Sequence, residues 1–408
     1  MTNKNEQRKV PELRFPEFSG EWEEKELNEI ASFYKGKGIS KRDISEEGVN
    51  CILYGELYTK YGYQINEIYS HTDLDEKSLF EGLKNDVLIP SSGETAIDIA
   101  TASNLNINNV YLGGDINVIR PIKEYNGHFI SLSINGKNKK ELSKLAQGKT
   151  VVHLYNNEIK KLKINIPSIS EQQKIGEFFS KLDRQIELEE KKLALLEEQK
   201  KGYMQKIFSQ ELRFKDENGE EYPEWEEVVF SKLFKSKIEK NNDLEFDKNK
   251  IISVAKMQYK EDNNKDSSNE YMKTYNKMRL NDIAFEGNKS KDYRYGRFVL
   301  NDIGDGIVSH VFIVFSPIMD FESSFMKYYI NYEPIMGRKL LFATTSTLMM
   351  TSLKTNEFMN LSIRLPGINE QRKIGLFIST FNKKIETQNM KVSLLINMKK
   401  QLLNKMMI

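Results

Sequence analysis

Apolar residues recur at a 4-3-4-3 spacing in two separate stretches of the chain, one after Glu171 and one after Glu370. Eight of the ten spaced positions are apolar in each stretch. The polar exceptions fall at the same two places, Glu189 and Lys200 in the first stretch and Gln388 and Lys399 in the second. This pattern predicts two coiled-coil helices, whose shared polar positions would fix the register. The predicted apolar seam consists of Ile175, Phe179, Leu182, Ile186, Leu193, Leu196, Ile374, Ile378, Phe381, Ile385, Val392 and Leu395.

The two helical stretches are copies of one another. Residues 164–208 align without a gap on residues 363–407, with 18 identities in 45 positions. A helix of roughly 38 residues is about 57 Å long, which is more than one small module can cover, although an ordinary core helix remains the alternative. We expect the two helices to pack antiparallel about an approximate two-fold axis. The predicted N-caps are Ser170, in a capping box with Gln173, and Asn369.

A variable module precedes each helix. Short β-branched and aromatic runs separated by Gly, Asn, Asp and Ser predict strands at Val87–Ile89, Ile116–Arg120, Ile164–Ile166, Ile251–Val254 and Ile307–Phe315. The amphipathic stretch Gly136–Ala146 predicts a helix, so each module is expected to be α+β. The modules share only a faint frame: Leu83–Ile89 is similar to Arg279–Phe285, and Phe129–Asn135 to Phe325–Asn331. A divergent interior on a common frame is typical of a specificity module, and neutral drift would leave the same picture.

Composition places the chain among ordinary globular proteins. It has 408 residues, 39% hydrophobic and 29% charged, and a formal net charge of +2. No apolar run reaches the ~20 residues of a membrane helix, and the polar start is unlike a signal peptide. The single cysteine, Cys51, excludes an internal disulfide. We therefore expect a cytoplasmic protein that does not enter a membrane.

Several loops have side chains suited to DNA. In the first module, residues 34–42 combine four cations with glycines, which let the backbone approach a phosphate. In the second, residues 287–297 supply Arg and Asn for base edges and Lys for the backbone. The candidate DNA-binding residues are Lys35, Lys37, Ser40, Lys41, Arg42, Ser91, Ser92, Asn288, Lys289, Lys291, Tyr293, Arg294, Arg297, Thr345 and Ser346. For any one of these residues, a solvated surface loop is the simpler interpretation.

The chain contains no recognisable catalytic pattern. Gly148-Lys149-Thr150 imitates the end of a phosphate-binding loop but lacks the preceding glycine, since Ser143 stands there. The four histidines have no metal-ligand spacing, and no glycine-rich S-adenosylmethionine loop is present. We therefore predict no catalytic residues and no metal site.

The repeated helix start resembles one known family. The pattern P-x-[IL]-x-E-Q-x-K-I-G occurs at residues 167–176 and 366–375, and the chain opens with LRFPEF-x-G-x-W at residues 13–22. These motifs look like those of the specificity subunit of a type I restriction–modification enzyme, and the resemblance covers essentially the whole chain. The segment that leads into the second module, residues 212–225, departs from the LRFPEF-x-G-x-W pattern by a four-residue insertion.

The resemblance implies two target-recognition domains, each reading one half of a bipartite DNA site, separated by two long antiparallel coiled-coil helices. The implied divisions are an N-terminal segment 1–21, domain one 22–165, a central helical spacer 166–208, a linker 209–224, domain two 225–364 and a C-terminal helical spacer 365–408. The chain itself would be non-catalytic. Its implied partners are double-stranded DNA, two methylation subunits that flip and methylate an adenine, and restriction subunits, with S-adenosylmethionine, ATP and Mg on those partners.

Two rival interpretations remain. The chain could be a coiled-coil scaffold whose modules bind proteins, which predicts no salt-dependent affinity for DNA. It could also be an enzyme of unfamiliar type with its site inside one module, which predicts activity from this chain alone.

Overall fold

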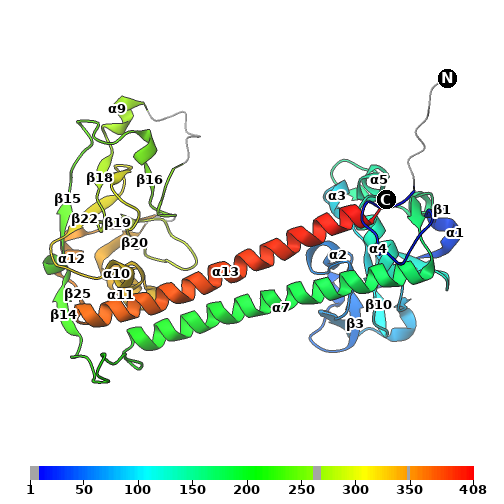
Figure 1. The fold of residues 1–408 in the computed structure, drawn as a ribbon, viewed down its shortest axis with the longest axis horizontal. Coiled ribbons are helices and arrows are strands. Elements are labelled where there is room, and N and C mark those ends of the chain that lie inside the picture. The colour runs from blue at the N-terminus through cyan, green and yellow to red at the C-terminus, as the bar shows by residue number, and fades with distance from the viewer. Residues whose placement is uncertain (1–8, 261–267, 347–349) are drawn as a thin grey trace. The chain divides into compact units, whose positions relative to one another are not determined.

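A computed structural model describes residues 9–260, 268–346 and 350–408, with the side chain of Ser346 left undescribed. The chain divides into two compact units (Figure 1). Unit 1 comprises Met1–Lys191 and Asn389–Ile408, and unit 2 comprises Lys192–Gln388. Each unit thus contains one module, the start of the helix that follows this module, and the end of the other long helix.

The two predicted long helices are present and uninterrupted. They are α7 (Ile169–Phe208) and α13 (Ile368–Met406), of 40 and 39 residues. They pair antiparallel inside each unit. In unit 1 Lys399 contacts Asp183 and Lys391 contacts Glu189, and in unit 2 the ring of Tyr203 packs on those of Phe377 and Phe381. The prediction of two antiparallel coiled-coil helices is confirmed.

The predicted capping residues were wrong by two positions. Both helices begin before Ser170 and Asn369, and Glu171 N donates to the Ser168 hydroxyl at 3.4 Å. In the second helix Gly367 precedes the first helical residue, Ile368. Ser168, two residues before Ser170, is a second serine that can cap the first helix, and its hydroxyl is the one that accepts from Glu171 N.

Unit 1 has a five-stranded sheet in the order β2-β11-β7-β9-β4 and a four-stranded sheet in the order β5-β3-β10-β6. Its strands are β1 (Glu23–Glu26), β2 (Ala31–Lys35), β3 (Val49–Ile52), β4 (Gln64–Ile65), β5 (Ser70–Thr72), β6 (Glu81–Gly82), β7 (Val87–Pro90), β8 (Ser92–Gly93), β9 (Ser103–Leu105), β10 (Val110–Leu112), β11 (Ile116–Pro121), β12 (Val152–His153) and β13 (Lys163–Ile166). Its shorter helices are α1 (Leu27–Ile30), η1 (Lys41–Asp43), α2 (Glu56–Thr59), η2 (Glu76–Ser78), α3 (Ala96–Ile99), α4 (Gly127–Asn135), α5 (Lys139–Lys144) and α6 (Asn156–Ile159).

Unit 2 has a four-stranded sheet in the order β15-β22-β19-β20 and four strand pairs, β14-β25, β16-β17, β18-β21 and β23-β24. Its strands are β14 (Glu226–Val229), β15 (Phe234–Lys237), β16 (Ile252–Ser253), β17 (Gln258–Tyr259), β18 (Asn276–Met278), β19 (Ile283–Glu286), β20 (Arg297–Leu300), β21 (Gly306–Val308), β22 (Ile313–Pro317), β23 (Thr344–Ser346), β24 (Thr351–Leu353) and β25 (Ser362–Leu365). Its shorter helices are α8 (Phe230–Leu233), η3 (Lys248–Lys250), α9 (Asn269–Met272), α10 (Ser323–Tyr329), α11 (Glu333–Ala343) and α12 (Thr355–Asn360).

The faint sequence frame of the two modules is a structural frame. The antiparallel trio β2-β11-β7 corresponds to β15-β22-β19, and the similar segments found in the sequence form β7 with α4 and β19 with α10. The single run predicted at Ile307–Phe315 is split into β21 and β22, and the helix predicted at Gly136–Ala146 is only Lys139–Lys144. Both units are α+β, as predicted.

Each hydrophobic core includes the end of the other copy's long helix. Leu403 and Met406 of α13, with Met407 directly after it, pack in the core of unit 1, which also holds Trp22 and Phe129. In unit 2, Ile207 and Phe208 of α7 take the corresponding places beside Trp225 and Phe325. Among the described helices, none is long and apolar enough to cross a membrane.

Candidate nucleic-acid interface

The glutamate of the repeated helix start joins the helix to the segment that leads into each module. Glu171 is 1% exposed and accepts two hydrogen bonds from Arg14, from Nε and Nη2, both at 2.7 Å. Glu370 is fully buried and accepts the same two bonds from Arg213, at 3.3 and 2.8 Å. These bidentate pairs raise the pKa of both guanidinium groups. The motif glutamate and the arginine of the LRF sequence are therefore one structural joint.

The glutamine of the same motif makes a second joint. Nε2 of Gln172 donates to Pro167 O at 2.9 Å, and its Oε1 accepts from Asn126 N, at the start of α4, at 2.9 Å. Gln371 repeats this in unit 2 with Pro366 O at 2.8 Å and Glu322 N, at the start of α10, at 2.9 Å. The glutamine thus fixes the module's own helix against the long helix. The sequence displayed this Glu-Gln pair in both copies, but only the structure assigns the two residues their partners.

The motif glycine allows close approach at this joint. A Cβ on Gly375 would lie 2.8 Å from Phe325 N and press on the side chain of Ser324. A Cβ on Gly176 would be 3.4 Å from the nearest atom, Nδ1 of His128. The sequence E-Q-x-K-I-G therefore positions the module against the long helix.

The candidate residues of the first module lie on one loop and at a buried strand end. Lys35 is the last residue of β2. The exposed loop and η1 that follow carry Lys37, Ser40, Lys41 and Arg42. The carboxylate of Asp43 stabilises the start of η1 by accepting from Ser40 N at 2.8 Å. Ser91 and Ser92 are only 5% and 6% exposed, which leaves them little surface for a phosphate.

Asp115 brings Lys35 and Ser91 together. Its carboxylate lies 3.4 Å from Lys35 Nζ and accepts from the Ser91 hydroxyl at 3.3 Å. The two sets that were far apart in the sequence therefore meet in unit 1.

The candidate residues of the second module lie on two adjacent hairpins. Asn288, Lys289, Lys291, Tyr293 and Arg294 occupy the loop between β19 and β20, and Asn288, Lys291 and Arg294 are exposed. Thr345 is exposed on β23, and Ser346 follows it. Thr351 joins the two hairpins, because its N–H donates to Gly287 O at 2.8 Å and its hydroxyl lies within hydrogen-bonding distance of Tyr295 O, at 3.1 Å.

Arg297 has a structural role. Its Nε donates to the buried Glu286 at 2.7 Å, Nη2 donates to Ala255 O at 2.9 Å, and the guanidinium lies over the ring of Tyr293 at 4.9 Å. These contacts hold the base of the loop and engage two of the five guanidinium N–H donors.

The two modules use the same edge. In unit 1 the residues that follow β7 pair with β12, with Ser92 opposite His153. In unit 2 the residues that follow β19 pair in the same way, with Asn288 opposite Met350. The polar candidates after β7 and after β19 therefore occupy corresponding positions, although their sequences differ.

The modules differ in the loop after their first sheet strand. Residues 36–42 of unit 1 carry Lys37, Lys41 and Arg42, whereas residues 239–245 of unit 2 carry three acidic side chains and one lysine. Those carboxylates surround Lys277, which is 5% exposed and lies 2.8 Å from Glu245 and 2.9 Å from Asp243. Bonds from Arg279 and Lys277 lower the pKa of Glu245 to about 2. The negative charge of residues 239–245 is therefore balanced by Lys277 and Arg279 of the same unit.

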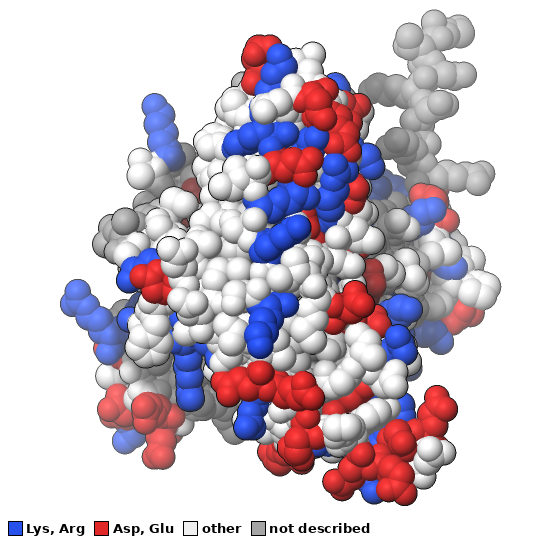
Figure 2. Space-filling view, turned by 90° about the vertical axis from the view of Figure 1, so that its left-hand side faces the viewer, with Lys and Arg blue, Asp and Glu red and all other residues white. Residues whose placement is uncertain are grey.

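The surface charge is mixed. On the face in Figure 2, Lys and Arg alternate with Asp and Glu in the upper part, and acidic side chains gather along the lower edge. The described part of this face therefore carries no continuous patch of positive charge. Over the described residues, no group of three or more His, Cys, Asp or Glu side chains could hold a metal ion.

Comparisons with known proteins agree with this architecture. Residues 19–198 match the family model for the type I restriction modification DNA specificity domain. The fold is similar to that of the S subunit of a type I restriction-modification system from M. genitalium, with a TM-score of 0.57 and 17% identity over 98% of this chain and 99% of that one.

A second similar fold comes from a structure that addresses complex assembly and conformational transition of the type I R-M system. It has a TM-score of 0.55 and 13% identity over 94% of this chain and 97% of that one. Residues 19–198 therefore resemble the type I restriction modification DNA specificity domain, and the whole chain has a fold similar to that of these two structures.

Proposed function

We propose that this chain recognises a bipartite DNA site, with one module reading each half. The observation that carries the proposal is the contrast between joint and edge: the Glu-Gln joint is the same in both units, whereas the residues after β7 and after β19 differ. A shared joint that carries different exposed loops is suited to two modules that recognise different half-sites. The loop cations would hold phosphates, and Asn288 and Arg294 would contact base edges.

The chain is proposed to act through partners. Two methylation subunits would dock on α7 and α13, flip a target adenine and methylate it with S-adenosylmethionine, and restriction subunits with ATP and Mg would cleave. One face of α13 supports such docking. Met390, Leu394 and Met398 follow one another at four-residue spacing and are 62%, 68% and 41% exposed.

The test is a genome-wide map of N6-methyladenine in a methylation-free host. The host expresses a type I methylation subunit from the same source with this chain, and in parallel that subunit alone. We expect a new split motif only when this chain is present. Exchange of residues 22–165 should then change one half of the motif and leave the other half intact.

A purified complex gives a second readout. DNA affinity should fall steeply with salt, and replacing Lys37, Lys41 and Arg42 by Ala together should reduce the slope of log K against log salt by about three times 0.9. The matched control is Lys192→Ala, an exposed lysine of α7 outside both modules. A stable complex with the methylation subunit that produces no new methylation and binds DNA independently of salt would favour a protein-binding scaffold instead.

A further inference from the structure

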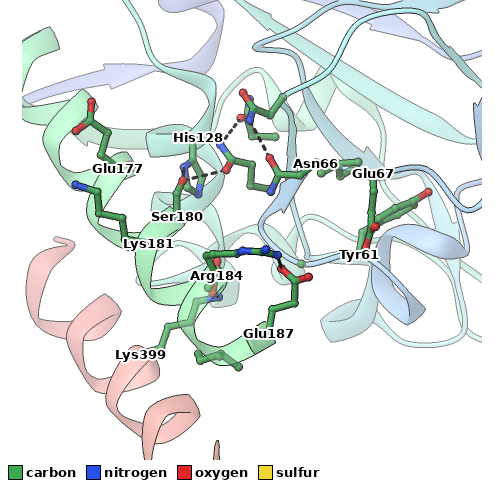
Figure 3. Close-up of a pocket in the computed structure, with 18 of the residues that line it drawn as sticks. Tyr61, Asn66, Glu67, His128, Glu177, Ser180, Lys181, Arg184, Glu187 and Lys399 are labelled. Carbon is green, nitrogen blue, oxygen red and sulfur yellow. Dashed lines mark hydrogen bonds and ion pairs between the residues drawn. The ribbon is translucent and has the colours of Figure 1, made fainter. Parts of the chain in front are cut away.

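Unit 1 contains a groove between its sheet and the long helix. The groove has a volume of about 1180 Å³ and runs between the segment around β4 and the first half of α7. Figure 3 shows Ser180, Lys181, Arg184 and Glu187 of α7 on one side, and Tyr61, Asn66 and Glu67 on the other. The candidate DNA-binding residues of this module are all absent from its lining.

The sheet wall of this groove is an open strand edge. β4 is the last strand of the order β2-β11-β7-β9-β4 and pairs with β9 only, in parallel. Asn104 N donates to Tyr63 O at 2.9 Å, and Asn106 N donates to Ile65 O at 3.0 Å. Because successive residues of a strand point their peptide groups to opposite sides, the N–H and C=O groups of Gln64 and Asn66 face away from β9. No described residue bonds to them.

Charge argues against DNA as the occupant. The lining carries five cations, Lys60, Lys84, Lys181, Arg184 and Lys399, and five carboxylates, Glu67, Glu177, Asp183, Glu187 and Glu190. Three of the cations are already paired: Lys60 with Glu56, Arg184 with Glu187 and Lys399 with Asp183. A phosphate backbone would meet as many negative as positive groups, and most of the positive ones are engaged.

The groove also has an unsatisfied polar floor. His128 is 3% exposed, lines the groove and has no partner for Nε2 among the described residues. The Ser180 hydroxyl donates to Gln64 Oε1 at 2.9 Å, so at its 3.3 Å contact with His128 it accepts from Nδ1. This assignment leaves Nε2 as a buried acceptor with no partner among the described residues.

We infer that this groove binds an extended, uncharged polar segment of a methylation subunit, which adds as a strand to β4. A strand edge facing a helix across an open groove is the geometry of β-strand addition, in which backbone bonds supply affinity and side-chain pockets supply selectivity. The helix wall from Gln173 to Glu190 spans about 26 Å at 1.5 Å per residue, which accommodates about eight extended residues at 3.3 Å each. The identity of the partner rests on the proposed function; the edge and the groove do not.

Hydrogen exchange resolved to single amides tests the inference on the full chain. Addition of the methylation subunit should slow exchange at Gln64 and Asn66, and addition of DNA alone should not. A complex that forms without slowing these amides would overturn the groove inference and leave the proposed function standing. Slowing by DNA alone would make DNA the occupant, and failure to form any complex would contradict both proposals.

A matched pair of variants isolates the backbone donor. Asn66→Pro removes the outward N–H without touching the bonds to β9, and Asn66→Ala removes only the side chain. We expect Asn66→Pro to bind the methylation subunit about 3- to 10-fold more weakly than Asn66→Ala, as for the loss of one hydrogen bond. Equal affinities would contradict strand addition. If Asn66→Pro fails to fold, Lys181→Trp fills the groove from α7 and should weaken binding at least as much.

Discussion

The two units join the module to its long helix in the same way, with different residues at matched positions around the joint. In unit 2, Glu370 accepts from Arg213 and also from Nε1 of Trp225 at 3.2 Å. In unit 1, Glu171 accepts from Arg14, and Nε1 of Trp22 is buried with no partner among the described residues. His128 lies against Gly176, where Ser324 lies against Gly375. The comparison teaches that the motif fixes the joint, while the residues around it set how tightly each joint is packed.

The largest expected loss of stability comes from removing the motif glutamate. Glu370→Ala leaves Arg213 and Trp225 without their shared acceptor, and should destabilise unit 2 by about 3 kcal/mol. Glu171→Ala removes an acceptor from Arg14 alone. The loss of stability in unit 1 should therefore be about 1 kcal/mol smaller than in unit 2, because no indole bond is lost. Hydrogen exchange reports the stability of each unit separately. Equal losses in the two units would show that the indole bond contributes nothing.

The motif glycines should respond in opposite directions. Gly375→Ala forces a Cβ against backbone atoms of α10 and should cost about 2 kcal/mol. Gly176→Ala meets nothing closer than 3.4 Å, and replacing a helical glycine by alanine should stabilise unit 1 by roughly 0.5 kcal/mol. Urea unfolding of each variant, followed by a probe in the affected unit, checks the signs. A stabilising Gly375→Ala would mean that α10 moves freely.

Acid should weaken unit 1 through His128. Burial, with Lys399 nearby, lowers the pKa of His128 to about 4. Below pH 6.5 the unfolded histidine binds a proton and the folded one does not, so stability falls as the pH drops from 6.5 to 4. Between pH 7 and pH 5 this removes about 2 kcal/mol.

His128→Gln should abolish the loss of stability between pH 7 and pH 5 that His128 causes. The measurement is the difference in unfolding free energy between the two proteins at each pH, which cancels the titration of Asp183, whose pKa burial raises. Parallel pH profiles for the variant and the parent would contradict the assignment.

The smallest expected effect concerns the tryptophans. Trp225→Phe loses an indole bond to Glu370, and Trp22→Phe loses none. We expect Trp225→Phe to cost about 1 kcal/mol more than Trp22→Phe, measured by the same exchange experiment. A larger cost at Trp22 would mean that its indole N–H has a partner in solution.

The parts of the fold that sequence reasoning predicted are those governed by periodicity. The 4-3-4-3 spacing placed two long helices correctly, and each of the twelve seam residues is at least partly buried. Glu189 and Gln388, the shared polar positions, are 7% and 6% exposed. The predicted helix starts were less accurate. Ser168 and Ser170 are equally good capping residues by type, and the sequence does not show which of them lies beside the first turn of the helix.

The candidate site was predictable by residue type and not by geometry. The sequence identified polar loops, and the structure shows that Arg297 holds Glu286, that Ser91 and Ser92 are buried, and that Lys35 meets Ser91 at Asp115. Those outcomes depend on contacts between residues far apart in the chain, which spacing cannot encode. The open edge of β4 left no sequence signal at all, because it depends on where the neighbouring strand ends.

The composition of unit 1 has a consequence for the order of synthesis. Its core requires Leu403, Met406 and Met407, and Leu13 N donates to Lys405 O at 2.9 Å, as Leu212 N donates to Lys206 O in unit 2. Residues 389–408 leave the ribosome after the whole of unit 2, which is one continuous segment. The first module made is therefore the last to complete its core, and until then it exposes an apolar surface that nascent-chain chaperones would have to shield.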